Sequence, residues 1–277
     1  MKNKCSVVVN SCDAFEDLWE PFFVLLKHNW KNCPYDIYLN TEKRKYEDAD
    51  GKVKSICHES EIAWSDRLIS TLKRVNSQYV ILLLDDFLVD GNVNQNMIDR
   101  CIEYLDKDRK IACFSFYPSK WRDIDNGKYP GFELRPTCGE YRFNMQAALW
   151  RKRDLLHILA KNETPWQTEE RGTFRARVLM PKREFYAIKK DEDLPFFYEY
   201  GGAIHRGMWT EDTPALLEKY GIKGINFDIR GIDPRPTSDW AKMELGKEAD
   251  IPKKKKIRIV IGEYLLAKGI LKWKERS

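Results

Sequence analysis

Apolar and polar positions along the chain follow two periods, one typical of strands and one of helices. Residues 79–84 form an unbroken apolar run, Tyr-Val-Ile-Leu-Leu-Leu, which predicts a strand buried on both faces of a sheet. Near the amino end, a short apolar run at 6–9 is followed by apolar residues at helical spacing through 15–30. We therefore expect a β-α start and a buried strand in the middle of the sheet.

The rest of the pattern continues this alternation. We expect further strands at 35–39, 53–57, 110–117 and through 186–188, and helices at 64–75, 93–105 and 147–161. Residues 118–141, rich in Gly, Pro, Trp and Tyr, predict an irregular binding loop. Strands that alternate with helices predict an α/β fold with a mostly parallel central sheet flanked by helices.

Two adjacent carboxylates, Asp85 and Asp86, close the buried run. A protein interior accepts such a pair only where it emerges at the end of the strand or meets a cation, and the carboxyl end is where open α/β sheets bind ligands. Mg²⁺ and Mn²⁺ take one or two carboxylates and leave other positions to water and phosphate oxygens. Two interpretations stay open: a metal-diphosphate site, or a turn that the carboxylates cap and Asp90-Gly91 completes.

Composition narrows the class of protein. The chain has 277 residues, 43% hydrophobic and 13% aromatic, and a formal net charge of only +5, which excludes a disordered chain and does not call for nucleic acid as a partner. Seven scattered cysteines without a Cys-x-x-Cys pair predict reduced thiols and no zinc site. Because no signal peptide and no apolar run of about 20 residues is present, we expect a cytoplasmic protein.

The β-α start, the carboxylate pair closing a buried strand and the later Pro165-Trp166-x-x-Glu169 together resemble GT-A-fold glycosyltransferases, particularly bacterial enzymes that build capsular or lipopolysaccharide glycans. The resemblance covers most of residues 1–235. It implies a Rossmann-like domain whose nucleotide-sugar half is about 1–117 and whose acceptor half is about 118–235. Residues 236–277 would then be a basic, helical C-terminal extension.

The resemblance implies a transferase of the hexosyltransferase type. Its donor would be a nucleotide-sugar, with a UDP-sugar favoured, and its acceptor a growing surface polysaccharide or a lipid-linked oligosaccharide. In the family an Asp-x-Asp motif holds Mn²⁺ or Mg²⁺ against the donor diphosphate. The carboxylates are adjacent here, so Asp86 would be the metal ligand, with His205 as a further ligand, and Asp85 would contact the ribose or lie beside the metal ligands. The other donor-binding residues would be Asn10, Ser11, Asp13, Asn40, Thr41, Asp66, Arg67 and Arg206.

Some of these residues also have ordinary structural interpretations. Spacing alone favours Asp66 and Arg67 as a solvent-exposed pair at the start of a helix. His205, in a glycine-rich turn, would equally suit a satisfied structural histidine.

Glu169 is the predicted catalytic base. Inversion at an anomeric carbon needs a carboxylate that removes the acceptor proton, and Glu169 follows Trp166 by three residues, as in the Trp-x-x-Glu pattern of the family. Glu170 is the alternative base, or a partner of Arg171. Trp166 and Tyr141 would contact the acceptor. Without the resemblance, both glutamates would be read as ordinary surface carboxylates.

Two other function classes stay open. A sugar-phosphate nucleotidyltransferase would share the fold and the metal chemistry, but it would be expected to show a glycine-rich basic loop after the first strand, and residues 10–16 contain neither Gly nor a basic residue. A non-catalytic protein that binds glycans or a membrane surface is the third class. Basic and apolar residues alternate through 253–273, which suits either peripheral contact with the inner face of an anionic membrane or a solubilising tail.

Overall fold

The computed structural model describes residues 4–58, 62–118, 123–139, 141–199 and 202–235. Within these ranges the first half of the chain alternates strands and helices: β1 Cys5–Asn10, the 3₁₀ turn η1 Asp13–Phe15, α1 Glu16–Asn29, β2 Asp36–Asn40, β3 Val53–Ile56, α2 Trp64–Arg74, β4 Tyr79–Leu84, α3 Gln95–Lys107 and β5 Ile111–Ser115. The second half contains β6 Phe132–Leu134, β7 Ala148–Arg151, α4 Lys152–Ile158, α5 Pro165–Leu179, β8 Glu184–Ile188, β9 Ile204–His205, β10 Met208–Trp209, α6 Thr213–Lys219 and the 3₁₀ turn η2 Phe227–Ile229.

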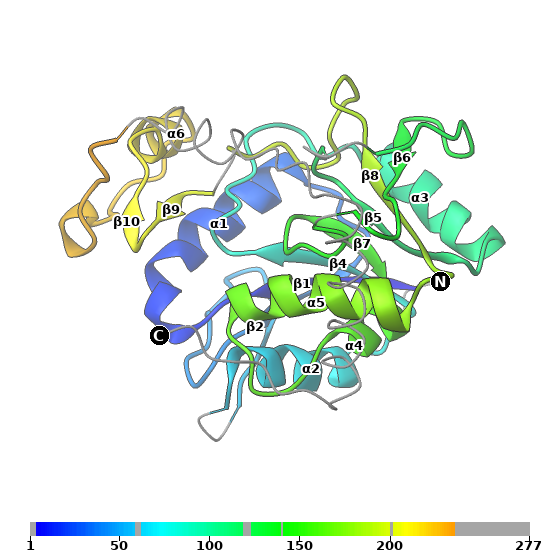
Figure 1. Ribbon diagram of the computed structural model, residues 1–277. Coiled ribbons are helices and arrows are strands. Elements are labelled where there is room, and N and C mark those ends of the chain that lie inside the picture. The colour runs from blue at the N-terminus through cyan, green and yellow to red at the C-terminus, as the bar shows by residue number, and fades with distance from the viewer. Residues whose placement is uncertain (1–3, 59–61, 119–122, 140, 200–201, 236–277) are drawn as a thin grey trace.

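Eight strands form one sheet in the order β3-β2-β1-β4-β7-β5-β8-β6. The pairs β2–β3, β1–β2, β1–β4 and β5–β8 are parallel, whereas β7 runs antiparallel to both β4 and β5, and β6 antiparallel to β8. The helices α1 and α3 lie over one face of the sheet and α2, α4 and α5 over the other (Figure 1). This arrangement confirms the predicted Rossmann-like α/β fold with a mostly parallel central sheet.

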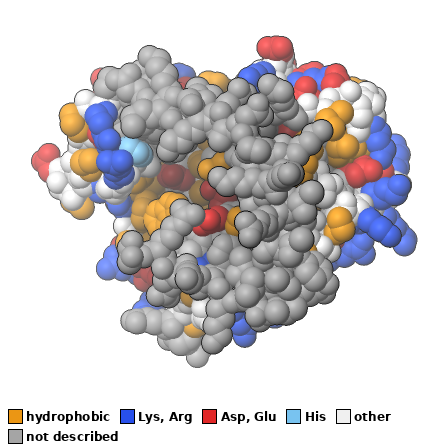
Figure 2. Space-filling model, in the orientation of Figure 1, with side chains coloured by type: hydrophobic (Ala, Val, Ile, Leu, Met, Phe, Trp, Pro, Cys, Tyr) orange, Lys and Arg blue, Asp and Glu red, His pale blue; other side chains and the backbone are white. Residues whose placement is uncertain are grey.

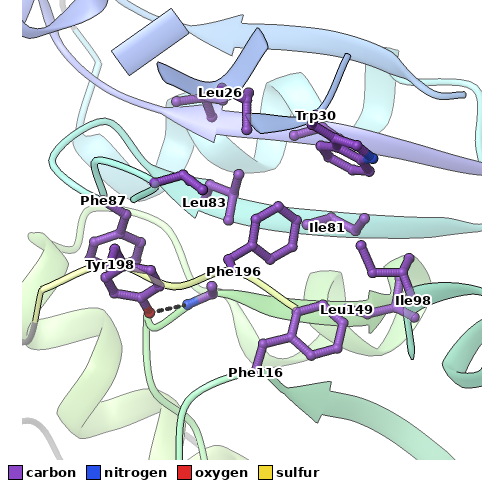
Figure 3. Packing of buried hydrophobic residues seen from close by; sticks show 14 of the residues in the cluster. Leu26, Trp30, Ile81, Leu83, Phe87, Ile98, Phe116, Leu149, Phe196 and Tyr198 are labelled. Atoms are coloured by element: carbon purple, nitrogen blue, oxygen red, sulfur yellow. Dashed lines mark hydrogen bonds between the residues drawn. The ribbon is translucent and has the colours of Figure 1, made fainter. Parts of the chain in front are cut away.

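The strand β4 is buried on both faces, as its apolar run predicts. Ile81 and Leu83 belong to the core beneath α1 and α3, where Leu26 of α1 and Trp30, which follows the helix, face them (Figure 3). Val80 and Leu82 belong to the core on the opposite side, under α2, α4 and α5. Because successive side chains of a strand point to opposite faces, this central strand needs apolar residues at every position.

The predicted helix at 147–161 is wrong in its first part. Residues 148–151 form the strand β7, and the helix α4 begins only at Lys152. All four residues of β7 are buried, because the strand lies between β4 and β5 inside the sheet. A strand buried on both faces loses its two-residue alternation, so its pattern is hard to distinguish from the start of a helix.

Two further elements differ from the sequence-based expectation. Residues 165–179 form the fifteen-residue helix α5, for which no element was predicted. Within the loop expected at 118–141, residues 132–134 form the edge strand β6. The basic extension at 236–277, with its predicted helix and membrane contact, lies outside the described residues.

Candidate active site

The two predicted carboxylates directly follow the carboxyl end of β4, and the first of them, Asp85, is buried and hydrogen-bonded to another side chain. It is 6% exposed and accepts a hydrogen bond from the Ser11 hydroxyl, which follows β1. The Ser11 oxygen in turn accepts a hydrogen bond of 2.7 Å from Trp19 Nε1 on α1. Burial, and then the adjacent charge of Asp86, raise the pKa of Asp85 well above its ordinary value. Asp85 is therefore held in place by its neighbours.

Asp86 has a different environment. Its Oδ1 atom is buried and accepts no hydrogen bond from the described part of the chain, and burial raises the pKa of this carboxyl to about 7. Its backbone oxygen, by contrast, accepts hydrogen bonds from the amides of Ala203, at 2.8 Å, and Leu88, at 3.1 Å. A buried carboxylate oxygen without a partner is costly unless a cation or a proton meets it.

Asp86 suits a divalent cation, although the protein supplies few ligands. Among the described residues no group of three or more His, Cys, Asp or Glu side chains could hold a metal ion. Mg²⁺ is commonly held by one or two carboxylates together with water and substrate phosphates, so the unpartnered oxygen of Asp86 fits an ion that arrives with a diphosphate.

His205 lies at the end of β9, in a hairpin with β10. Its Nδ1 atom is 2.8 Å from Oδ2 of Asp233, and Asp233 also accepts a hydrogen bond of 2.6 Å from Arg235. These hydrogen bonds, the one from Arg235 foremost, lower the pKa of Asp233. The Asp233 carboxylate thus orients the imidazole ring, and a metal role for His205 stays a prediction.

The predicted donor-binding amides, Asn10 and Asn40, end the neighbouring strands β1 and β2. Asn40 Nδ2 donates to Asn10 Oδ1, and Asn40 Oδ1 accepts a hydrogen bond of 2.7 Å from Thr71 on α2. His58 Nε2 lies 3.1 Å from the same oxygen. All four side chains are buried, so this network fixes the ends of the two strands against α2.

Asp13 shapes the loop that follows β2. Its carboxylate accepts a hydrogen bond of 2.8 Å from the Thr41 hydroxyl and further bonds from the backbone amides of residues 42–44. Burial opposes the charged form, but these hydrogen bonds outweigh it and lower the pKa of Asp13. Asp13 and Thr41 therefore hold the rim of the site, close to where the resemblance places the nucleoside.

The side chains of Asp66 and Arg67 face different segments of the structure. Arg67 is 5% exposed and donates to Glu42, at 2.9 Å, and to the backbone oxygen of Ser11, at 3.5 Å. It therefore lies beside the carboxyl end of β1, and it is not a solvent-exposed residue. Asp66 accepts a hydrogen bond of 2.6 Å from the backbone amide of Asn162, so its carboxylate faces the loop before α5.

Glu169 lies on α5, and its position follows from the way that helix begins. Thr164 caps α5 in a capping box with Gln167. One turn later Glu169 Oε1 accepts a hydrogen bond of 3.0 Å from the backbone amide of Met145. In the antiparallel pairing of β4 with β7, Ala148 at the start of β7 is opposite Leu82, so the segment before β7, which contains Met145, lies toward the carboxyl end of β4. The predicted base and the carboxylate pair thus lie at the same end of the sheet.

The residues predicted to contact the acceptor surround α5. Trp166 is 79% exposed at the start of the helix, and Tyr141 is 50% exposed in the segment before β7. Glu170 points to solvent, and Arg171 lies 3.7 Å from Glu163. An exposed Trp next to a half-buried glutamate is a suitable platform for a sugar ring.

Two cavities open on the described part of the molecule, and the first adjoins Asp86. One of about 260 Å³ lies between Asp86 and α6, with Leu88, Phe197, Gly202 and Lys219 among its lining residues. Figure 2 shows acidic and hydrophobic side chains in a hollow on this face of the molecule.

The second cavity, of about 530 Å³, lies between η1 and the β9–β10 turn. Its lining includes Asp13, Arg44, Arg206 and Arg230. Arg206 occupies the hairpin turn, where its φ is +52°, and its side chain is exposed. Arg230 pairs with Asp17 at 2.5 Å. The sequence does not single out this residue, because it belongs to a segment without a repeating pattern.

No protein-family model matches the sequence, and no curated protein matches it. Solved structures resemble the fold at low identity. TarS from S. aureus aligns over 95% of this chain with a TM-score of 0.49 and 11% identity, and this chain spans 43% of the TarS chain. TarS residues 1–349 with UDP bound align over 98% of this chain and 73% of that one, with a TM-score of 0.48 and 10% identity. CMP:2-keto-3-deoxy-manno-octonic acid synthetase with CTP aligns over 78% of this chain and 96% of that one, with a TM-score of 0.42 and 14% identity. Likeness at this level concerns the fold and does not identify an activity.

No helix in the described ranges is long and apolar enough to cross a membrane.

Proposed function

We propose that this chain is a glycosyltransferase that moves a sugar from a nucleotide-sugar donor, with a UDP-sugar favoured, to a saccharide acceptor with inversion. The observation that carries the proposal is the buried, unpartnered Oδ1 of Asp86 at the carboxyl end of the central strand. It lies beside Asp85, which the Ser11 hydroxyl holds. This arrangement suits a cation that neutralises a diphosphate.

Asp86 would hold Mn²⁺ or Mg²⁺ against the donor diphosphate. When bound, such an ion stabilises the negative charge that develops on the leaving nucleoside diphosphate. The rim formed by Asp13, Thr41 and Arg67 would receive the nucleoside. Arg206, exposed at the second cavity, would offer a positive charge to the phosphates.

Glu169 would act as the base. It would accept the proton of an acceptor hydroxyl while that oxygen forms a bond to the anomeric carbon and the bond from this carbon to the diphosphate oxygen breaks. The Met145 amide, which donates to Oε1, would hold the carboxylate in orientation. Trp166 would support the acceptor sugar with its exposed ring.

The first experiment is a thermal-stability screen of the protein with UDP, GDP, CMP and dTDP, each with and without Mn²⁺. A ligand present at 100 times its dissociation constant stabilises the fold by about 2.7 kcal/mol, which raises the melting temperature measurably. We expect one nucleotide to stabilise the wild type in a manner that needs Mn²⁺, and Asp86→Asn to abolish the effect. Asp36→Asn is the matched control, because Asp36 pairs with Lys54 at the strand edge.

Three other results would redirect the proposal. Stabilisation that does not need metal would remove the role of Asp86 as a metal ligand. Release of pyrophosphate from a nucleoside triphosphate and a sugar phosphate would favour a nucleotidyltransferase. No response to any nucleotide would favour a binding protein. A capsular or lipopolysaccharide acceptor, and membrane contact through 253–273, stay predictions.

A further inference from the structure

The backbone at Gly202 touches the carboxylate of Asp86. A Cβ atom placed on Gly202 would lie 2.5 Å from Asp86 Oδ2, 2.8 Å from its Cγ and 3.1 Å from its backbone oxygen. Distances below about 3.0 Å are not found between real Cβ atoms and their neighbours. Gly202 also has a φ of +77°, a conformation that glycine adopts without strain. The absence of a side chain here leaves the space that the carboxylate occupies.

Ala203 and Tyr198 contact the loop after β4. Ala203 donates its backbone amide to the Asp86 oxygen at 2.8 Å. Tyr198 stacks on Phe87 with ring centroids 4.3 Å apart and an interplanar angle of 11° (Figure 3). Tyr198 and Ala203 therefore contact Phe87 and Asp86, and the backbone of Gly202 lies close against the Asp86 carboxylate.

We propose that Gly202 is a positioning residue for Asp86: by leaving out a side chain, it sets the direction in which the carboxylate faces the cavity under α6. The inference rests on the proposed function for what the carboxylate does there, but the positioning itself is a steric statement. A methyl group at 202 would push the carboxylate from its place, since the Asp86 side chain can rotate whereas the backbone at 202 is held by a hydrogen bond from its amide to the Glu199 oxygen.

The test compares Gly202→Ala with Gly221→Ala. Gly221 has a similar φ of +68°, but a Cβ there would meet nothing within 4 Å, so this control carries the backbone strain without the contact. The probe is Mn²⁺ alone, titrated into each full-length variant and followed by electron paramagnetic resonance. We expect Gly202→Ala to weaken Mn²⁺ binding at least tenfold and Gly221→Ala to leave it within twofold. Wild-type affinity in Gly202→Ala would overturn the proposal.

A second measurement does not depend on metal. Gly202→Ala and Gly221→Ala are each combined with Asp86→Ala, and the melting temperatures form a double-mutant cycle. We expect Gly202→Ala to lower the melting temperature more than Gly221→Ala when Asp86 is present, and by the same amount when Asp86 is alanine. If the wild type binds no Mn²⁺, the metal part of the proposed function fails while this cycle still decides the role of Gly202. Additive melting temperatures would overturn that role.

Discussion

Asp85 and Asp86 are neighbours in sequence, but their carboxylates differ in hydrogen bonding. One carboxylate is held by the Ser11 hydroxyl, which Trp19 supports in turn. The other has a buried oxygen without a partner in the described residues. Two adjacent carboxylates in a poorly solvated place raise each other's cost of ionisation. The pair therefore combines one fixed polar group with one group that is available to a cation.

The raised pKa of Asp86 predicts how stability depends on pH. Its value of about 7 in the fold exceeds the ordinary 3.8, so the folded state binds the proton more tightly than the unfolded state does. The contribution of Asp86 to the free energy of unfolding is therefore fully present below about pH 4 and is lost as the pH rises through 7. At pH 8 without metal we expect Asp86→Asn to be more stable than the wild type, by up to about 4 kcal/mol.

Urea unfolding in EDTA between pH 4 and pH 8 would measure this difference. The advantage of Asp86→Asn should shrink toward pH 4, because the folded state keeps Asp86 protonated and the unfolded carboxylate also becomes partly protonated there. Asp36→Asn, at an exposed ion pair, should show no such advantage at pH 8. A constant difference between Asp86→Asn and the wild type across this range would contradict the assignment of the raised pKa.

Glu169 allows a second prediction at this scale. Glu169→Gln keeps the acceptor for the Met145 amide but removes the base, so we expect kcat to fall by about 10² to 10⁴ with the affinity for the donor nucleotide unchanged. Steady-state kinetics and nucleotide titration together measure both quantities. Glu170→Gln, one position further along α5 and exposed, is the control. Equal losses in the two variants would argue against Glu169 as the base.

At the scale of elements, the helix α5 decides where Glu169 lies. The start of this helix could have been predicted from the sequence, because Thr164 and Gln167 form a capping box and Pro165 occupies the first turn. The strand β7 could not be predicted from the sequence, since its four buried residues show no two-residue alternation of apolar and polar side chains. β4 was predicted correctly because its apolar run is long and ends on two charges.

Gly172 lies where α5 packs closely against Phe143 in the segment before β7. A Cβ there would lie 2.6 Å from Phe143 Cδ1 and 3.2 Å from Ile158 Cγ2. Although alanine favours a helix over glycine by about 1 kcal/mol, we expect Gly172→Ala to destabilise the protein by about 1 to 3 kcal/mol, because overpacking outweighs that gain. Chemical denaturation measures it. The penalty should shrink in a Phe143→Leu background, and stabilisation in the wild-type background would contradict the packing argument.

At the scale of the whole molecule, the candidate site is assembled from segments far apart in the sequence. The order β1-β4-β7 brings Ser11, Asp85 and Met145 to one end of the sheet. The carboxylate pair and the Trp-x-x-Glu pattern could be singled out as candidate site residues from the sequence alone, because they are recognised by residue type and short spacing. The sequence did not predict that Gly202 approaches Asp86, or that Arg67 faces Ser11 while Asp66 faces Asn162. Those contacts depend on the strand order and on loops without a periodic pattern.

Tyr198 joins the two predicted halves of the site. Its ring stacks on Phe87 beside Asp86, while its hydroxyl donates to Gln146 at 2.8 Å and accepts from the Ala147 amide at 3.2 Å. Tyr198→Phe keeps the stacking and loses both hydrogen bonds. We expect it to cost about 1 kcal/mol of stability and to lower kcat, with the affinity for nucleotide and Mn²⁺ preserved.

Tyr198→Leu removes the stacking as well, so it should also weaken binding of nucleotide and Mn²⁺ by releasing the loop that carries Asp86. Calorimetric titration, with kinetics on the same preparations, separates the two variants. Their difference follows from the position of the side chain, because the ring supports the carboxylate end of β4 and the hydroxyl supports the segment that hydrogen-bonds Glu169. If Tyr198→Phe weakened nucleotide binding as much as Tyr198→Leu, the hydroxyl would be the group that supports the Asp86 loop, and this division of roles would be wrong.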